Sequence, residues 1–394
     1  MYIYLITGGA KYAGKQCGVF SVITYVVCSL FFVFFLASCT RQNEESWRPG
    51  KPLEKDKIKI GIIHPNRIEE SSSYDYSHYV GTLEMQREIG LRDDQIIRKI
   101  NIYEAEPDTT ANAIQDCIKE GANIIIAASF GYMDACEKLA AKFPNVVFAH
   151  ATGFKHNAVN FTNYFGRIYQ ARYLSGIAAG LKTKTGKIGY VAAMGKENSE
   201  VTSGINAFAL GVERVNPKAY IYVRLTYSWF DPMGEGVAAK RLIASGCDVI
   251  AAHCNTPSAQ IAAQDAGVWS IGYNNDMSKD APRSVITSVV LHWGVAYTYL
   301  IRSVIDGTFT TAPYFGSLKD GMVGITPISE KLAAPGTEKK IAQERERIIN
   351  GSFDVFEGVM KTNDGKRIGE TGKSLSDDEI RGGINWYYRT VIEE

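Results

Sequence analysis

Short apolar runs alternate with stretches of helical spacing from residue 57 onward. "KIKIGIIHP" (57–65) precedes the helical "YVGTLEMQREIGL" (79–91), and "ANIIIAAS" (122–129) precedes the helical "MDACEKLAAKFP" (133–144). Fully buried strands of a parallel sheet are continuously apolar, and helices connect them. The pattern therefore predicts βαβ units, and with them an α/β protein whose mainly parallel sheets are flanked by helices.

The same alternation returns between residues 184 and 276. Residues 118–129 can be laid over residues 243–254 at a constant offset, since each segment is a helix end, a glycine and then a strand. A chain of 394 residues is also longer than the ~250–300 residues at which a single core stops growing. We predict two similar α/β lobes, and the modest identity between them supports this similarity more than it supports a duplication.

The N-terminus differs from the rest of the chain. Lys11 and Lys15 precede an uncharged, strongly apolar run (17–38), which ends in "LASC" at Cys39. This order resembles a bacterial lipobox, so we predict a signal peptide at residues 1–38 and a lipid on Cys39. The alternative is an uncleaved transmembrane helix. Either reading places the remainder outside the cytoplasm and attached to a membrane, with residues 39–57 as a polar, flexible tether.

Composition excludes one large class of partner. Lys and Arg number 43 against 42 Asp and Glu, and they form no long basic cluster, so a nucleic-acid partner is not expected. Four cysteines remain after residue 39: Cys117, Cys136, Cys247 and Cys254. Their spacing matches no metal motif, and we predict small buried thiols, although the sequence does not settle their disulfide state.

The residues that follow the apolar runs define a candidate site. The carboxyl ends of parallel strands carry the ligand edge of open α/β sheets, so two such edges facing each other would enclose a ligand between the lobes. The candidates are Tyr74, His78, Ser129, Phe130, Asp134, Trp229, Phe230, Asp231, Asn274 and Asp276. Rings and neutral hydrogen-bonding groups suit a flat heterocycle, and the lack of an Arg or Lys clamp argues against phosphates and free carboxylates.

Each ring has an alternative role in the core or at a hinge between lobes. For Trp293, which precedes a long apolar helix, packing is the favoured interpretation. In the "SFGYMD" loop (129–134) we expect Phe130 to be the stacking wall, with Tyr132 as the weaker candidate.

Catalytic patterns are missing from the sequence. The histidines are scattered, with no HxH or HExxH motif, and there is no GxSxG motif. An enzyme such as a nucleosidase would need a carboxylate cluster or a metal, so we predict no catalytic residue, no metal and no cofactor.

Ordered motifs from about residue 58 to the C-terminus resemble one family. They are "YDYSHYVG", "SFGYMD", "FAHATGFK", "YFGRIYQARYLSGIAAG", "GINAFALG", "WFDP", "GYNNDMS", "LKDGMV" and "LSDDEI". The chain resembles the BMP (basic membrane protein) family of substrate-binding lipoproteins of ABC transporters, and within it the purine-binding branch. The resemblance implies the two-lobed type I periplasmic binding protein fold, a purine base or nucleoside as ligand, and an ABC permease as partner.

Three positions depart from the pattern of that branch. Tyr74 stands where the stacking aromatic is usually Trp, Asn274 stands where the family has Asp, and Leu291 stands where the nucleoside-binding branch has Lys. The last two departures favour a bare base over a nucleoside, and a specificity outside the purines stays open.

These observations lead to one hypothesis and one alternative from another class. Lobe 1 is expected from 58–160 and 285–315, and lobe 2 from 161–284 and 316–394. The leading hypothesis is a monomeric, lipid-anchored receptor that closes on its ligand and presents it to a permease. The alternative is an extracytoplasmic sensor or adhesin lipoprotein on the same fold.

Overall fold

The computed structural model describes residues 47–68, 74–104 and 106–394. Residues 48–394 form one compact unit. The predicted signal peptide and the predicted lipid on Cys39 lie outside the described residues. No helix within the described ranges combines the length and the apolar character needed to cross a bilayer.

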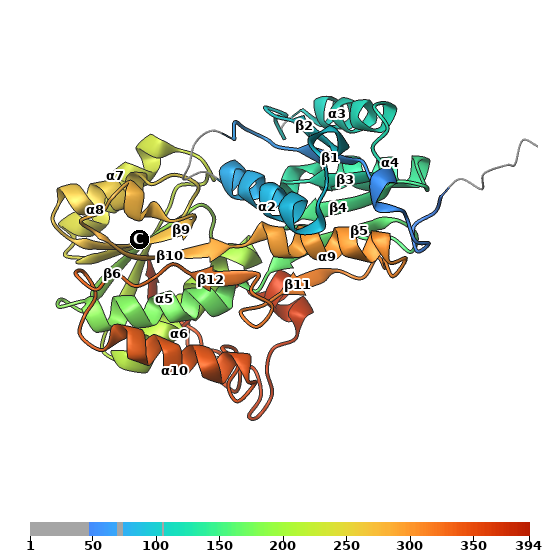
Figure 1. The fold of residues 1–394 in the computed structure, drawn as a ribbon. Coiled ribbons are helices and arrows are strands. Elements are labelled where there is room, and N and C mark those ends of the chain that lie inside the picture. Colours follow the sequence, from blue (N-terminus) through green and yellow to red (C-terminus); the bar gives the residue numbers. More distant parts are fainter. Residues whose placement is uncertain (1–46, 69–73, 105) are drawn as a thin grey trace, which may run out of the picture. The chain divides into compact units, whose positions relative to one another are not determined.

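The first sheet contains strands from the N-terminal part of the chain and one late strand (Figure 1). In the described residues its order is β11-β5-β4-β3-β1-β2, and all neighbouring strands are parallel. The bounds are β1 Ile60–Ile63, β2 Ile96–Lys99, β3 Ile124–Ala127, β4 Val147–Ala151, β5 Phe161–Gly166 and β11 Tyr314–Gly316. This sheet and its helices are called lobe 1.

Helices cover both faces of the first sheet. The helices of lobe 1 are α2 Tyr74–Ile89, α3 Pro107–Lys119, α4 Met133–Lys142 and α9 Trp293–Ile305. Phe161 of β5 belongs to the apolar core shared with α3 and α4, whereas Tyr164 of the same strand contacts Trp293 and Tyr297 of α9. Because side chains alternate along a strand, α9 and its neighbour α2 lie on the opposite face from α3 and α4.

The second sheet is built in the same way (Figure 1). Its order in the described residues is β12-β10-β9-β8-β6-β7-β15, with β12 antiparallel to β10. The strands are β6 Lys187–Ala192, β7 Tyr220–Leu225, β8 Val249–His253, β9 Trp269–Asn274, β10 Val285–Leu291, β12 Val323–Ile325 and β15 Val391–Glu393. The helices are α5 Ile168–Lys182, α6 Ser199–Val215, α7 Pro232–Ala244, α8 Ser258–Asp265 and α10 Thr337–Ile349. This sheet and its helices are called lobe 2.

The two lobes share one topology. The run β2-β1-β3-β4-β5 of the first sheet has the same order as β7-β6-β8-β9-β10 of the second. The two segments that the sequence aligned contain β3 and β8, the third strand of each run. The prediction of two similar α/β lobes is therefore confirmed, and the predicted strands and helices between residues 57 and 276 all form.

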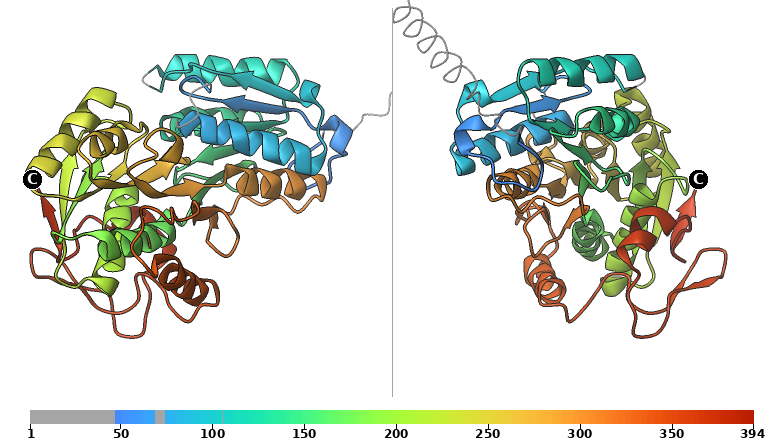
Figure 2. Two further views of the ribbon diagram at one scale, coloured as in Figure 1. Left: turned by 60° about the vertical axis from the view of Figure 1, so that its left-hand side comes forward. Right: turned by 90° about the vertical axis from the view of Figure 1, so that its right-hand side faces the viewer.

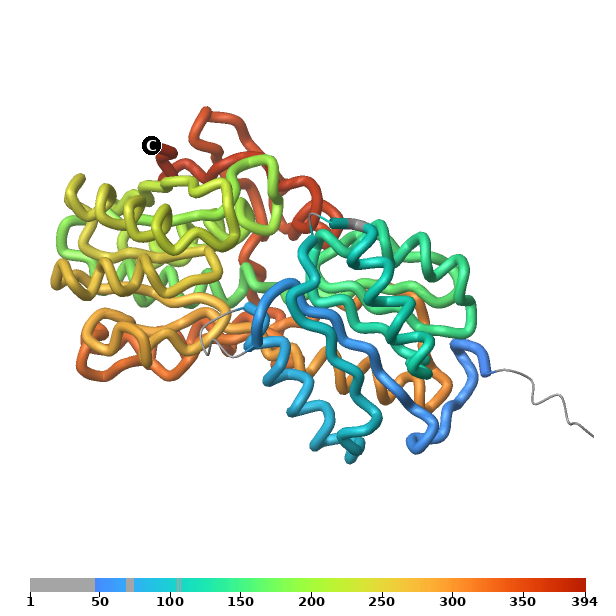
Figure 3. The backbone as a smooth tube through the Cα atoms, turned by 90° about the horizontal axis from the view of Figure 1, so that it is seen from above, coloured from blue at the N-terminus to red at the C-terminus, as the bar shows by residue number. Residues whose placement is uncertain are grey.

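The strands divide between the sheets at other places than predicted. Strand β5 lies in the first sheet although residues after 160 were expected in lobe 2, and β10 lies in the second sheet although 285–315 was expected in lobe 1. The chain crosses between lobes only after each strand is complete, past Gly166, Leu291 and Gly316 (Figure 3). An apolar run shows that a strand is buried, but it does not show which sheet the strand joins.

The three crossings pack tightly against one another. The Arg167 N–H donates to the carbonyl of Gly316 at 2.6 Å, and the His292 N–H donates to the carbonyl of Met322 at 2.8 Å. At Gly166 a Cβ atom would lie 2.5 Å from Val323 Cγ1, so a side chain has no room there. These three crossings connect the lobes and are called the hinge.

The C-terminal segment returns to lobe 2 and also touches lobe 1. After the hairpin β13 (Met360–Lys361) and β14 (Arg367–Ile368), a π-helical turn, η5 (Glu379–Gly383), leads to β15, which pairs with β7 (Figure 2). Asp377 forms an ion pair with Arg167 at the hinge. The side chain of Arg381 reaches Gly153 and Asn163 of lobe 1.

Two predictions about buried residues are confirmed. Cys117, Cys136, Cys247 and Cys254 are buried free thiols. Trp293 is fully buried, its ring stacks on that of His78, and its Nε1–H donates to Ser77 Oγ at 3.0 Å. Within the described ranges, no group of three or more His, Cys, Asp and Glu side chains is placed to hold a metal ion.

Candidate functional site

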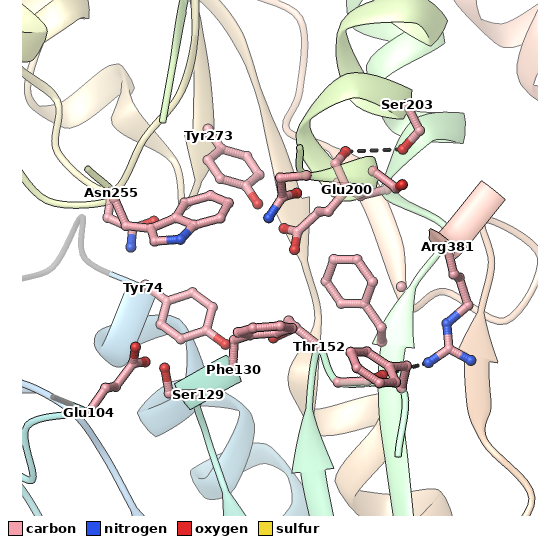
Figure 4. A pocket seen from close by; sticks show the side chains of 18 of the residues that line it. Tyr74, Glu104, Ser129, Phe130, Thr152, Glu200, Ser203, Asn255, Tyr273 and Arg381 are labelled. Atoms are coloured by element: carbon pink, nitrogen blue, oxygen red, sulfur yellow. Dashed lines mark hydrogen bonds between the residues drawn. The ribbon is translucent and has the colours of Figure 1, made fainter. Parts of the chain in front are cut away.

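A cavity of about 570 Å³ lies between the two lobes. Its walls come from the segments that follow β1, β2, β3 and β4 in lobe 1, from those that follow β6, β7 and β8 in lobe 2, and from Tyr273 near the end of β9, so the strand carboxyl ends do line it, as predicted (Figure 4). The volume falls within the range of about 300–1,000 Å³ found for small-molecule sites. Five of the predicted site residues line it: Tyr74, Ser129, Phe130, Trp229 and Phe230.

The lobe 1 wall presents rings that are held from behind by buried histidines. Tyr74 begins α2, and its ring packs edge-on against that of His78, with 4.5 Å between centroids. Phe130 follows β3 with 49% of its surface exposed, and the His150 Nε2–H donates to the carbonyl of Ser129 at 2.7 Å, which fixes that loop. Burial lowers the pKa of His150 to about 4, so this support is neutral near pH 7. Phe130 is thus held at the surface of the cavity.

Tyr132, the second ring of the same loop, points the other way. It is fully buried in the core of lobe 1, and its hydroxyl donates to the carbonyl of Ile102. The structure therefore brings Phe130 rather than Tyr132 to the cavity, which is the arrangement that the sequence favoured.

The lobe 2 wall also carries rings. Trp229 and Phe230 lie in the loop before α7, and Tyr273 lies near the end of β9. The Trp229 ring packs edge-on against His253 with 6.0 Å between centroids. Figure 4 shows Tyr273 across the cavity from Tyr74 and Phe130, so a flat ligand between the walls meets rings on both sides.

Glu200 places a carboxyl group on the lobe 2 wall. It is the second residue of α6, its side chain is 19% exposed, and it extends towards the cavity (Figure 4). Burial raises the pKa of Glu200 to about 7, against the opposing effects of the Arg172 charge and a hydrogen bond with Tyr273. Near neutral pH this carboxyl is therefore partly protonated and can donate a hydrogen bond as well as accept one.

A buried arginine lies beneath this wall. Arg172 of α5 is fully buried, and its guanidinium carbon lies 4.2 Å from the Tyr273 ring centroid and 5.5 Å from that of Tyr190. Its Nη1 donates to the carbonyl of Ala252 at 2.8 Å, while Nε and Nη2 have no hydrogen-bond partner. Its positive charge and burial lower the pKa of neighbouring His253, burial being the larger cause.

Charged groups also stand at the two ends of the cavity. Burial raises the pKa of Glu104, which follows β2 and accepts a hydrogen bond from the Gly131 N–H. Arg381, from the C-terminal segment, donates through Nη2 to the carbonyl of Gly153 at 2.6 Å and to Asn163 Oδ1. The prediction that no Arg or Lys lines the site is therefore wrong. The guanidinium is, however, engaged with the two oxygens of lobe 1.

Five of the predicted residues do not line the cavity, and three of them are His78, Asp134 and Asp231. His78 is fully buried behind Tyr74, where it is hydrogen-bonded to the Tyr297 hydroxyl. Asp134 lies on α4 with its side chain 84% exposed and pairs with Lys155 at 2.9 Å. Asp231 caps the N-terminus of α7, accepting from the Gly234 N–H at 2.9 Å. These side chains serve packing, a surface ion pair and a helix cap.

Asn274 and Asp276 also lie outside the cavity lining. Asn274 is 1% exposed, has a left-handed φ of 67°, and donates through Nδ2 to Asn255 Oδ1 at 2.8 Å. Asp276 accepts from the Ser278 N–H at 3.0 Å as an N-cap. The cavity is lined instead by Tyr273 and Asn255. The prediction was thus displaced by one residue along β9, where side chains alternate between faces.

Several lining residues were missed by the sequence analysis: Glu104, Thr152, Phe154, Tyr169, Glu200, Ser203, Phe315 and Arg381. Glu200 had a recognisable signal, because it lies in the first turn of the helix that follows a predicted strand. Arg381 had none, since it is distant in sequence from every strand end that forms the site.

Comparisons with known proteins agree with this geometry. The Bmp family model, described as "ABC transporter substrate-binding protein PnrA-like", matches residues 57–357. A purine-binding protein from Brucella abortus (strain 2308) is 35% identical over 88% of this chain and 96% of its own length. A Haloferax volcanii (strain DS2) protein with the name of an ABC transporter glucose-binding protein is 35% identical over 64% of this chain and 63% of its own length.

Solved structures support the fold. A solute-binding protein of an ABC transporter system from Conexibacter woesei DSM 14684 matches with a TM-score of 0.63 at 20% identity, over 75% of this chain and 98% of that protein. The predicted two-lobed periplasmic binding protein fold is confirmed by this match and by the two sheets. Because the family model covers most of the chain, this protein belongs to the Bmp family of ABC transporter substrate-binding proteins.

Proposed function

We propose that this protein binds a purine base between its two lobes and delivers it to the permease of an ABC importer, making and breaking no covalent bond. The observation that carries the proposal is the cavity itself, in which rings from both lobes face each other beside hydrogen-bonding side chains. The purine-binding relative from Brucella abortus supports this ligand class. Delivery follows from membership of the family.

The supporting rings suit stacking on a flat heterocycle. Tyr74 and Phe130 on one side and Trp229 and Tyr273 on the other supply stacking contacts worth about 0.5–1.5 kcal/mol per pair beyond burial. Ser129, Glu200 and Asn255 offer donors and acceptors for the edge of the base. At the level of sequence, Asn274 and Leu291 replace charged residues of the nucleoside-binding pattern and favour a bare base, although neither side chain lines the cavity.

Closure at the hinge supplies the mechanism. The three crossings at Gly166, Leu291 and Gly316 are the connections through which the lobes move relative to each other. A ligand that contacts both walls stabilises the closed state in proportion to its differential affinity for that state. The permease then receives a closed, loaded receptor.

The lipid on Cys39 and an extracytoplasmic, monomeric receptor form the second part of the proposal. The "LASC" sequence supports it. Labelling of expressing cells with a palmitate analogue should mark the wild-type chain and leave Cys39→Ser unlabelled. Equal labelling of both chains would contradict the anchor and leave the ligand proposal untouched.

Ligand identity is tested with the full chain purified in detergent. Denaturation should release a bound ultraviolet-absorbing compound that mass spectrometry identifies as a purine. Titration with adenine, guanine, inosine, ribose and glucose should quench tryptophan fluorescence only with purines, because Trp229 lines the cavity. If glucose changes the fluorescence and melting temperature while no purine does, the purine proposal is wrong and a sugar ligand replaces it.

A further inference from the structure

The glutamates that line the cavity differ in the hydrogen-bond partners of their carboxyl oxygens. Glu104 accepts from the Gly131 N–H, and Glu197 Oε1 accepts from the Gly195 N–H at 2.8 Å. Glu200 has its hydrogen bond with the Tyr273 side chain and keeps a part of its carboxyl open to the cavity. Among these acids, Glu200 is the one held on its wall by a neighbouring side chain rather than by the backbone.

The neighbours of Glu200 come from several elements. His253 at the end of β8 has its Nε2 3.7 Å from Glu200 Oε1, and that nitrogen is buried without a hydrogen-bond partner. Arg172 of α5 lies below, in contact with the Tyr273 ring of β9. Tyr74 of α2 faces it from lobe 1, Glu197 precedes it in the chain, and Arg381 lines the same cavity.

Burial and the nearby charge of Arg172 have opposite effects on Glu200, so its neutral and ionised forms are similar in free energy near pH 7. Arg172 lies within no described ion pair, so its positive charge stabilises a carboxylate at Glu200, while burial opposes ionisation. His253 is neutral because burial and Arg172 lower its pKa, so it adds no second positive charge. The group is therefore a carboxyl that a ligand can hold in the neutral form.

Resting on the proposed function, we propose that Glu200 binds the edge of the base as a neutral carboxylic acid, with its O–H donating to a ring nitrogen and its C=O accepting from an exocyclic N–H. Adenine presents this adjacent acceptor and donor. A carboxylate in the same place would set a lone pair against the ring nitrogen, and the buried polar groups would be left unpaired. Glu200 is thus the residue that determines specificity for an amino-substituted base.

The proposal predicts a pH dependence with a definite sign. Because the neutral acid binds the base, adenine affinity is highest below the pKa of about 7 and falls above it. Between about pH 6 and about pH 8 the affinity should fall roughly tenfold, since only about a tenth of the carboxyl is neutral at the higher pH.

Calorimetric titration of the full chain in detergent with adenine tests this prediction, using two variants of the same residue. Glu200→Gln keeps one donor and one acceptor, so it should bind adenine within about threefold of the wild type at about pH 6 and show no fall at about pH 8. Glu200→Ala should bind at least roughly tenfold more weakly at both pH values. Glu338→Gln is the matched control, since Glu338 is also the second residue of a helix, is exposed on α10, and should keep the wild-type profile.

Each outcome has one meaning. If Glu200→Gln is as weak as Glu200→Ala, the charged form binds and the proposal is overturned. It is also overturned if all variants follow the wild-type profile. If the wild type binds no purine at either pH, the proposed function itself fails. Melting temperatures of the variants within a few degrees of the wild type at about pH 6 separate loss of binding from loss of folding.

Discussion

The two walls of the cavity are built on the same strand order, but different side chains lie behind their rings. In lobe 1, rings rest on buried histidines that burial keeps neutral: His78 lies behind Tyr74, and His150 holds the loop of Phe130. In lobe 2, the Tyr273 ring rests on a buried arginine and adjoins a carboxyl at Glu200. One topology thus supplies a wall whose rings rest on neutral histidines and a wall in which one ring rests on a charged arginine. We infer that lobe 1 supplies most of the stacking and lobe 2 the edge contacts.

The largest expected effect comes from removing a ring of the lobe 1 wall. Phe130→Ala should weaken purine binding by about 2–3 kcal/mol, roughly 30- to 150-fold, because a stacking face and its burial are both lost. The melting temperature should change little, since the Phe130 side chain is 49% exposed. Isothermal titration and thermal denaturation measure the two quantities.

A buried thiol in lobe 2 provides the control for this variant. Cys254 is fully buried behind the wall and does not line the cavity, so Cys254→Ala should leave affinity nearly unchanged while lowering stability slightly. Equal losses of affinity in the two variants would contradict the placement of Phe130 against the ligand.

The next effect concerns the acids of lobe 2 and the stability of the chain. Glu235 of α7 is fully buried and accepts from the Thr256 hydroxyl at 2.6 Å, and burial raises its pKa to about 7. As pH rises from about 4.5 to about 7, the unfolded state loses this proton before the folded state does, so the free energy of unfolding falls. In Glu235→Gln, the free energy of unfolding should fall by about 1–2 kcal/mol less than in the wild type as pH rises. Denaturant unfolding at about pH 5 and at about pH 8 measures this difference.

The histidines of lobe 1 have the opposite effect on the pH dependence of the free energy of unfolding. Burial lowers the pKa of His64 and His78, so the unfolded state gains protons first as pH falls below about 6.5, and stability is lost towards acid.

Glu346→Gln, at an exposed position of α10, is the control for the variant at Glu235 and should leave the pH profile of unfolding unchanged. A Glu235→Gln profile parallel to that of the wild type would show that this acid ionises in the folded state as it does in the unfolded one.

The smallest expected effect on affinity comes from removing a contact between the two lobes. Arg381→Met removes the hydrogen bonds from the C-terminal segment to Gly153 and Asn163 of lobe 1, so the closed state loses a contact that spans both lobes. Affinity should fall roughly 3- to 10-fold, with the loss mainly in a faster dissociation rate. Stopped-flow fluorescence measures that rate.

Arg389→Met is the matched variant within one lobe. Arg389 pairs with Glu213 at 2.6 Å, and both residues belong to lobe 2, so no contact between lobes is lost. Dissociation rates that change equally in both variants would indicate a general effect of the C-terminal segment rather than a link between the walls.

Much of the architecture followed from the sequence because local pattern and topology agree. The apolar runs around Ile124 and Val249 are buried central strands, and the loop residues Phe130 and Trp229 lie at the cavity because strand carboxyl ends point there. Asp231 and Asp276 follow the same rule in sequence, yet their side chains turn back to cap helices, which is the commonest use of Asp at such positions. A pattern along the chain does not distinguish a cap from a ligand contact.

Other features depend on contacts that are distant in sequence. Arg381 reaches the cavity because η5 packs on α6 of lobe 2 and the arginine side chain extends from there to Gly153 of lobe 1. The strand membership of β5 and β10 is decided by where the chain crosses between the sheets. Burial raises the pKa of Glu200 against the opposing charge of Arg172, a neighbour 28 positions earlier that no spacing rule connects to it. These are properties of the assembled fold.

The crossings at the hinge have a consequence for the order in which the chain becomes native. The N-terminal strands alone do not complete lobe 1. Its helix α9 and its edge strand β11 come after strands β6 to β10 of lobe 2 in the chain. Ser77 and Trp293, which hydrogen-bond across the α2–α9 contact, are 216 positions apart. Until that late segment arrives, α2 covers that face of the first sheet without α9, and the ring of His78 lacks its stacking partner Trp293. Loops of this length close slowly, so the earliest part of the chain to emerge is also among the last to be completed.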